Sequence, residues 1–120
     1  MSNNETKLQQ EIRLAFGKIP TLRLFRNQVG QLPDPRTGRP VQFGLAKGSS
    51  DLIGFKKIKI TEDMIGQEIA QFVSIEIKTE KGKLTPQQKN WLTFISKSGG
   101  ITGVARSIED VFNILSLKHN

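Results

Sequence analysis

The 120-residue chain has no cysteine and only one histidine, His119. Without cysteine there is no disulfide framework, no thiolate zinc site and no cysteine nucleophile. The lone histidine, which we expect to lie in a frayed chain end, argues against Ser-His-Asp catalysis and against histidine-rich metal sites. Enzyme chemistry in this chain must therefore come from carboxylates, lysine, hydroxyl groups or a metal held by oxygen atoms.

Long apolar runs and tyrosine are also missing. No stretch reaches the roughly 18 apolar residues of a membrane span, so we expect no membrane segment. The first residues, MSNNETKLQQE, are polar and include acids, unlike a secretory signal, which favours a cytoplasmic location. Seven Phe and one Trp are few for a single-strand binder built on base stacking. The length suits a single domain covering residues 1–120.

Positive charge, in contrast, is abundant. The chain carries 18 Lys and Arg residues against 11 Asp and Glu, which gives a net charge of +7 and a pI near 10.0. A basic domain of this size favours a polyanionic partner, most often nucleic acid. The alternative is a soluble protein that is merely basic, and charge alone does not separate the two.

Periodicity and turn residues predict a mixed α/β protein. Helices are expected where apolar residues recur every three to four positions, and strands where they alternate. The predicted order is helix 4–16, strand 22–27, loop 28–50, strand 51–60, turn 61–67, strand 69–79, helix 86–98, strand 101–105 and a last helix after Ser107. The loop is basic and rich in Gly and Pro, and a loop of this length inside a compact domain is usually functional or mobile.

The helix that follows the turn EKGK begins with a recognisable cap. Thr85 is placed as N-cap, Pro86 as the first helical residue and Gln88 at the third position, which is the capping-box pattern. We expect Trp91, one turn further along, to lie in the core.

The segment FVSIEIKTEKGKLTPQQKNW carries the strongest chemical signal. Glu76 and Lys78 lie two positions apart on a strand, so their side chains share one face and the apolar residues share the other. One interpretation is an exposed ion pair, worth only about 0–1 kcal/mol. The other is an active site, because Asp51 opens the neighbouring strand and two carboxylates brought together repel unless a cation lies between them. Mg²⁺ needs few protein carboxylates, and Lys78 is then placed to hold or deprotonate a water.

These residues resemble the PD-(D/E)XK nuclease signature, formed by Asp51 and the triplet Glu76-Ile77-Lys78. More narrowly, the chain resembles the VRR-NUC family, including its small stand-alone phage and bacterial members. The resemblance rests on the helix with Glu11, RN at 26–27, GSSDLIG at 48–54, IEIKTEKGKLTPQQ at 75–88 and GG at 99–100. Ser50 stands where the superfamily has its nominal Pro. The fold implied is a restriction-endonuclease-like α-β-β-β-α-β core with a mixed central sheet flanked by helices.

The resemblance implies a set of metal ligands. Asp51 and Glu76 would bind the cation directly, with the backbone carbonyl of Ile77 as a third ligand. Glu11 would join through water or a second metal. The implied cofactor is Mg²⁺ or Mn²⁺, with no small organic cofactor.

The resemblance also implies roles in catalysis and DNA contact. Lys78 would position or activate the attacking water, and Gln88 would reach the same site from its helix, although as a capping-box residue it has a structural role as well. Arg26 and Asn27 would lie near the scissile strand. We add as phosphate contacts the basic residues of the loop, Arg36, Arg39 and Lys47.

The implied activity is hydrolysis of a DNA phosphodiester to a 5′-phosphate and a 3′-hydroxyl, in a prokaryotic or phage-infected cell. Stand-alone members of the family are expected to be homodimers that cut branched DNA such as four-way (Holliday) junctions, in recombination, repair or replication. Two alternatives stay open. One alternative is a catalytically silent nucleic-acid-binding module on the same fold, which would not need the carboxylate pair. The other is a site-specific restriction-type enzyme, for which the chain is small.

Overall fold

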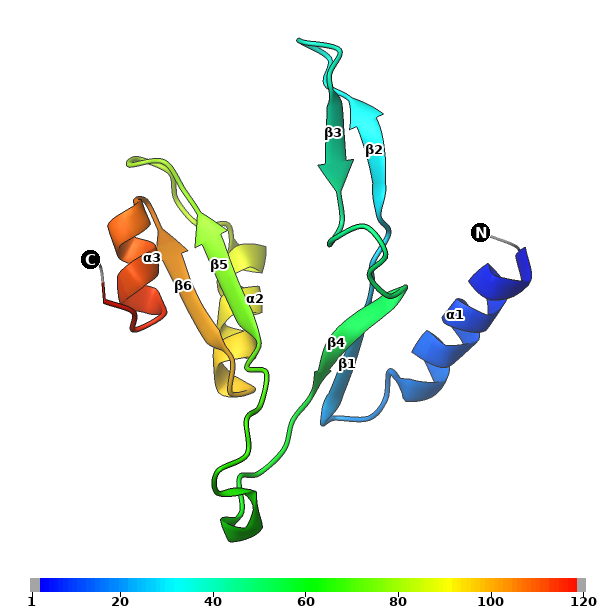
Figure 1. Cartoon of the computed structure of the whole chain (residues 1–120), viewed down its shortest axis with the longest axis vertical. Coiled ribbons are helices and arrows are strands. Elements are labelled where there is room, and N and C mark those ends of the chain that lie inside the picture. Colours follow the sequence, from blue (N-terminus) through cyan, green and yellow to red (C-terminus); the bar gives the residue numbers. More distant parts are fainter. Residues whose placement is uncertain (1–2, 119–120) are drawn as a thin grey trace. The chain divides into compact units, whose positions relative to one another are not determined.

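The computed structural model describes residues 3–118 and divides the chain into two compact units, Met1–Ile58 and Lys59–Asn120. Figure 1 shows the elements of both. His119, expected to lie in a frayed end, falls outside the described residues. No helix in the described part of the chain is long and apolar enough to cross a membrane.

The first unit combines one helix with two antiparallel strand pairs. Strands β1 and β4 pair so that Leu24 lies opposite Gly54, and β2 and β3 form a hairpin with Leu32 opposite Val41. The elements are α1 (Asn3–Phe16), β1 (Leu22–Arg26), β2 (Gly30–Pro33), β3 (Pro40–Phe43) and β4 (Leu52–Lys56).

The hairpin corrects the expectation of an irregular loop at 28–50. Its tip is closed by Asp34, whose backbone N–H donates to the Arg39 carbonyl at 2.8 Å and whose Oδ1 accepts from the Arg36 N–H at 2.8 Å. The strands are only four residues long and are bounded by Pro33 and Pro40. Such short runs carry too few alternations to be distinguished from loop in the sequence.

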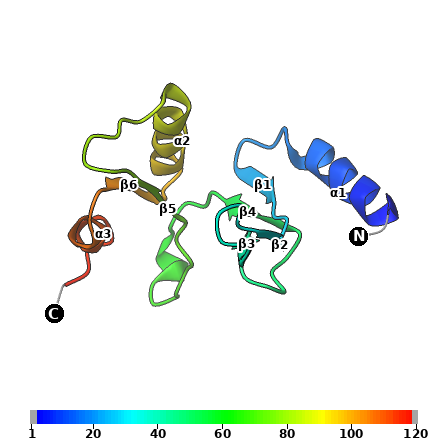
Figure 2. The ribbon, with the colours of Figure 1, turned by 90° about the horizontal axis from the view of Figure 1, so that it is seen from above.

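The second unit is built around a β-α-β crossover. Strands β5 and β6 run parallel, as strands joined by a crossover helix do, and Glu76 lies opposite Val104 in the register. Seen from above, α2 lies on one side of this strand pair and α3 on the other (Figure 2). The elements are the 3₁₀ turn η1 (Glu62–Met64), β5 (Val73–Ile77), α2 (Pro86–Lys97), β6 (Ile101–Ala105) and α3 (Ile108–Ile114).

Helix α2 starts and ends at residues that the sequence marks. The Thr85 hydroxyl accepts from the Gln88 N–H at 3.1 Å, and the Gln88 Oε1 accepts from the Thr85 N–H at 3.0 Å, so the capping box is complete. At the other end Gly99 has φ of +98°, and the Gly100 N–H donates to the Ile95 carbonyl at 3.0 Å. This is the Schellman ending that favours glycine.

The fully buried apolar side chains described are Ile95 of α2 and Ala105 of β6, each 1% exposed. On the face of β6 that carries both Ala105 and Gly103, the α3 residue Ile114 packs directly over Gly103, where an added Cβ would lie 2.5 Å from its Cδ1. The expectation that Trp91 lies in the core is wrong: its side chain is 38% exposed, and its indole Nε1 donates to the Ser74 Oγ at 2.8 Å.

The mixed α/β content that the sequence predicts is confirmed. The strands predicted at 51–60 and 69–79 are longer than the observed strands β4 and β5. Within residues 3–118 the strands pair as three two-stranded sheets, two antiparallel and one parallel. The single mixed central sheet of the expected core therefore stays a prediction, as does the single domain.

Candidate active site

Strand β5 presents Glu76, and Lys78 follows directly after the strand ends at Ile77. The Lys78 N–H donates to the Ala105 carbonyl at 3.0 Å, which carries the pairing with β6 one step beyond the strand. Side chains at alternate positions share a face. Glu76 and Lys78 accordingly come together on the side that α2 covers, while Ile77 is 69% exposed.

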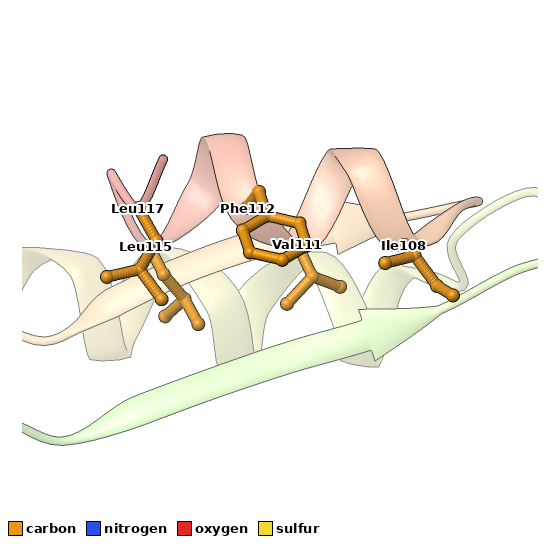
Figure 3. A pocket seen from close by; sticks show the side chains of 5 residues that line it. All are labelled: Ile108, Val111, Phe112, Leu115 and Leu117. Atoms are coloured by element: carbon orange, nitrogen blue, oxygen red, sulfur yellow. The ribbon is translucent and has the colours of Figure 1, made fainter. Parts of the chain in front are cut away.

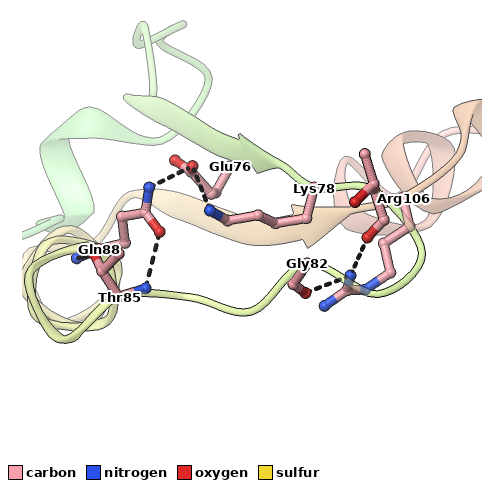
Figure 4. Close-up of polar contacts among 7 residues, drawn as sticks. Glu76, Lys78, Gly82, Thr85, Gln88 and Arg106 are labelled. Atoms are coloured by element: carbon pink, nitrogen blue, oxygen red, sulfur yellow. Dashed lines mark hydrogen bonds and ion pairs between the residues drawn. The ribbon is translucent and has the colours of Figure 1, made fainter.

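One carboxylate oxygen of Glu76 is the focus of the cluster. Its Oε1 lies 3.7 Å from the Lys78 Nζ and accepts a hydrogen bond from the Gln88 Nε2 at 2.9 Å (Figure 4). The side chains of Lys78 and Glu76 are 18% and 31% exposed. An ion pair this well covered is more constrained than a surface pair, whose two long side chains move freely in water.

Gln88 joins this cluster to the start of α2. Its Oε1 closes the capping box on Thr85 while its Nε2 reaches Glu76. The amide therefore caps the helix and also contacts Glu76, so the cap fixes the donor that points at the carboxylate, while the role of Gln88 in catalysis stays a prediction.

Sequence reasoning missed Arg106, which follows β6. Its Nη1 donates to the backbone carbonyls of Thr79, of Glu80 at 3.3 Å and of Gly82 at 2.8 Å, all in the turn after Lys78 (Figure 4). These contacts join residues 24 to 27 positions apart, so no local sequence pattern predicts them.

In the first unit, Asn27 organises the segment that leads to Asp51. Its backbone N–H donates to the Asp51 carbonyl at 2.9 Å, and its Nδ2 donates to the Ser49 Oγ at 2.8 Å and the Ser50 carbonyl at 2.9 Å. Its Oδ1 accepts from the Leu45 N–H at 3.0 Å. Three side-chain hydrogen bonds thus hold the 45–51 segment, which places Asp51 at the entrance of β4.

The remaining site residues predicted in the first unit are exposed. Glu11 lies on α1, Arg26 ends β1, and Arg36 and Arg39 flank the tip of the β2–β3 hairpin. The structure describes these residues and Asp51 within one unit, and Glu76, Lys78 and Gln88 within the other. Lys47 is exposed in the segment between β3 and Asp51.

A family model for the VRR-NUC domain matches residues 3–109 of the 120-residue chain. The chain belongs to the VRR-NUC family. This confirms the resemblance drawn from the motifs, and the match runs across both units. No curated protein and no solved structure matches the chain. VRR-NUC is a nuclease domain of the PD-(D/E)XK type, so membership of the family implies a DNA-cleaving function with DNA as the substrate.

The donor set of this VRR-NUC chain suits a hard divalent cation. In residues 3–118 no three His, Cys, Asp or Glu side chains gather into a group that could hold a metal ion. Glu76 nevertheless offers a partly exposed carboxylate, and its contacts with Lys78 and Gln88 both fall on Oε1. Carboxylate oxygens, a backbone carbonyl and water are the ligands that Mg²⁺ and Mn²⁺ take.

A pocket of about 290 Å³ in the second unit lies apart from this chemistry. It is lined only by apolar side chains of α3 and the segment after it: Ile108, Val111, Phe112, Leu115 and Leu117 (Figure 3). Without a polar or titratable group, the pocket has nothing to orient a phosphodiester or a metal. The polar cluster around Glu76 is the better candidate for the nuclease site.

Proposed function

We propose that this VRR-NUC protein is a divalent-metal-dependent DNA endonuclease that selects branched DNA, such as four-way (Holliday) junctions, over plain duplex. The observation that carries the metal-dependent part is the convergence of Lys78 and Gln88 on one oxygen of Glu76. A carboxylate, an amine and an amide donor held together by a strand and a capped helix are the types of group from which a hydrolytic site is built.

In this proposal Glu76 and Asp51 would hold Mg²⁺ or Mn²⁺, with the Ile77 carbonyl as a third ligand and Glu11 joining through water or a second ion. The bound cation would supply Lewis-acid stabilisation of phosphate charge and an acidified water. Lys78 would orient the attacking water and, as the neutral amine, take its proton. Gln88 would keep the Glu76 carboxylate in the orientation that binds.

DNA contact is assigned to cations of the first unit. Arg26 and the Asn27 segment would lie near the scissile strand, and the exposed Arg36, Arg39 and Lys47 would contact phosphates. The net charge of +7 supports a polyanionic substrate. A homodimer would provide two sites related by a two-fold axis, suited to symmetric cuts in a junction in recombination, repair or replication.

The test is a cleavage panel on labelled DNA: a four-way junction, a flap, single-stranded DNA and plain duplex, each with Mg²⁺, Mn²⁺ or chelator. We expect metal-dependent cutting, fastest on the branched substrates, that Glu76→Ala abolishes. Glu62→Ala, which removes an exposed acid from η1 in the same unit, is the matched control and should cut like the wild type.

Sedimentation of the free protein and of its junction complex tests the homodimer. Equal cutting of all four substrates would contradict the preference for branched DNA. Cutting that persists in Glu76→Ala would overturn the site, and tight DNA binding without cutting in either metal would favour the silent binding module.

A further inference from the structure

The turn that follows Lys78, residues 79–82, is hydrogen-bonded to Arg106, which follows the other strand of the β-α-β unit. We infer that Arg106 is a positioning residue: it holds the 79–82 turn against the aliphatic stem of Lys78 and thereby keeps the Lys78 ammonium beside Glu76. The catalytic consequence rests on the proposed function, whereas the conformational one does not.

The first step is the grip on the turn. The Arg106 Nη1 donates to the carbonyls of Thr79, Glu80 and Gly82, so one guanidinium binds three of the four carbonyls in the 79–82 segment. The Gly82 N–H itself donates to the Thr79 carbonyl at 3.1 Å. Hydrogen bonds with a charged partner are about twice as strong as those between neutral groups. A turn without other regular structure depends heavily on such a contact.

The second step is the contact between the turn and Lys78. A Cβ added to Gly82 would lie 3.4 Å from the Lys78 Cδ and 3.2 Å from the Thr79 Oγ1. The Gly82 backbone therefore lies beside the lysine stem, close enough that an added Cβ would be in van der Waals contact with it. The end of that stem carries the Nζ that lies 3.7 Å from the Glu76 Oε1.

The third step is that Arg106 is itself well anchored. Its backbone N–H donates to the Asp110 Oδ2 at 2.8 Å, and the Asp110 N–H donates to the Ser107 Oγ at 3.1 Å, which caps α3. The preceding residue, Ala105, is 1% exposed. Because the Arg106 backbone is fixed at the β6–α3 junction, its guanidinium holds the turn at a defined position relative to that junction.

The competing role for Arg106 is direct contact with a DNA phosphate, since its side chain is exposed. The two roles make different predictions. Loss of a phosphate contact weakens DNA binding and lowers its salt dependence. Loss of a positioning contact leaves DNA binding in place, slows the reaction at saturating DNA and loosens the turn.

The experiment compares wild type, Arg106→Gln, Arg106→Lys and the matched control Arg23→Gln. Arg23 also donates from Nη1 to backbone carbonyls, those of Ile19 at 3.2 Å and Leu22 at 2.8 Å, but in the first unit. Three quantities are measured: amide hydrogen exchange of residues 79–82, metal-free DNA affinity against salt, and single-turnover cleavage at saturating DNA.

For Arg106→Gln we expect at least about tenfold faster exchange of the Gly82 amide, because local opening costs less. Cleavage should fall about 10- to 100-fold, since misplacing a catalytic group by about an ångström has that effect. DNA affinity should stay within about twofold, and Arg106→Lys should recover part of both losses because an ammonium still donates to carbonyls. Arg23→Gln should leave the exchange of residues 79–82 unchanged.

Unchanged exchange in Arg106→Gln would overturn the inference, even if the protein cuts no DNA at all. A weakened affinity with a shallower salt slope and normal turnover would also overturn it, in favour of a phosphate contact. Gly82→Val gives an independent check if Arg106→Gln does not fold. A Cβ at this position already meets the Lys78 Cδ at 3.4 Å and the Thr79 Oγ1 at 3.2 Å, so a branched side chain must displace the lysine stem or the turn, and the same loss of turnover is expected; wild-type turnover in that variant would contradict the role of the turn.

Discussion

Glu76 shares one oxygen between an ammonium and an amide N–H, and we expect the two partners to contribute differently to catalysis. Lys78→Ala removes the group proposed to take a proton, which contributes about 10²- to 10⁴-fold in rate. We expect cleavage to fall by that amount while metal binding, measured by calorimetry, and DNA binding persist. Glu76→Ala should lose metal binding as well.

Lys97→Ala is the control for Lys78→Ala, because it removes an exposed lysine from the far end of α2. It should retain wild-type cleavage. If Lys78→Ala cut as fast as Lys97→Ala, Lys78 would be a structural partner of Glu76 and nothing more.

Gln88 can be separated from the helix cap in which it takes part. Thr85→Ala and Gln88→Ala both break the capping box, at a cost of about 0.5–2 kcal/mol in the free energy of unfolding. Only Gln88→Ala also removes the donor to Glu76, worth about 1.5–3 kcal/mol for a charged acceptor. Denaturant unfolding should therefore show Gln88→Ala as the less stable of the two variants, and cleavage should fall about tenfold or more in Gln88→Ala alone. Equal activity of both variants would assign Gln88 to the cap only.

Asn27 has a recognisable effect at the residue scale because its side chain makes three hydrogen bonds to the 45–51 segment. Asn27→Ala should reduce the free energy of unfolding by about 1–3 kcal/mol and slow cleavage through a displaced Asp51. Gln28→Ala, at the exposed neighbouring position, should change neither. An Asn27→Ala variant with weaker DNA binding and unchanged stability would instead support a direct DNA contact.

At the scale of elements, the β2–β3 hairpin is the part of the first unit best shaped to contact a duplex. A two-stranded ribbon fits the major groove. The turn at the hairpin's tip carries Arg36 and Arg39, and Asp34 holds it through hydrogen bonds to the backbone of both arginines. Neutralising both arginines to Gln should lower the slope of log affinity against log salt by about 2, since each phosphate contact contributes about 0.9. Turnover at saturating DNA should be unchanged.

The matched control neutralises Lys56 and Lys57 at the end of β4, which also removes two exposed positive charges. A salt slope that falls equally in both double variants would show a general effect of charge. It would then contradict a specific role for the hairpin.

Elements with strong local signals were predictable from sequence, and the others were not. Helix α2 carries Thr85, Pro86 and Gln88 at its start and Gly99 at its end. Thr85 and Gln88 satisfy backbone groups of the first turn, Pro86 lacks an N–H that would have no partner there, and Gly99 adopts the positive φ of the helix ending. The β2–β3 hairpin has four-residue strands, and its register depends on cross-strand pairs that no single strand reveals.

The candidate site divides in the same way. Glu76 and Lys78 were predictable because strand periodicity alone places them on one face, and Gln88 because the capping box fixes its position. Arg106 was not, because its partners lie across the β-α-β crossover and carbonyl groups leave no mark in the sequence. The exposed Trp91 was misplaced because an aromatic residue at helical spacing satisfies the pattern whether it packs in a core or hydrogen-bonds to Ser74 at the surface.

At the scale of the whole molecule, the proposed ligand set draws on both units, with Asp51 in one and Glu76 in the other. The VRR-NUC match likewise spans both. A metal that binds both carboxylates stabilises the folded chain by mass action, so saturating Mg²⁺ should raise the midpoint of thermal unfolding. Asp51→Ala and Glu76→Ala should each abolish that rise, and Glu62→Ala should keep it. A rise that survives in Asp51→Ala would remove that residue from the ligand set.

The same division permits a direct test of the single-domain prediction. Trp91 is the sole tryptophan and lies in α2, so its fluorescence reports on the second unit, whereas far-ultraviolet circular dichroism reports on the helices and strands of both. If residues 1–120 fold as one domain, the two signals should follow one urea transition with the same midpoint and slope. Measurements at two protein concentrations separate dissociation of a dimer from unfolding, because only the former depends on concentration. A dichroism change that begins well before the fluorescence change would mean that the first unit unfolds independently, and the chain would then be two domains sharing one family match.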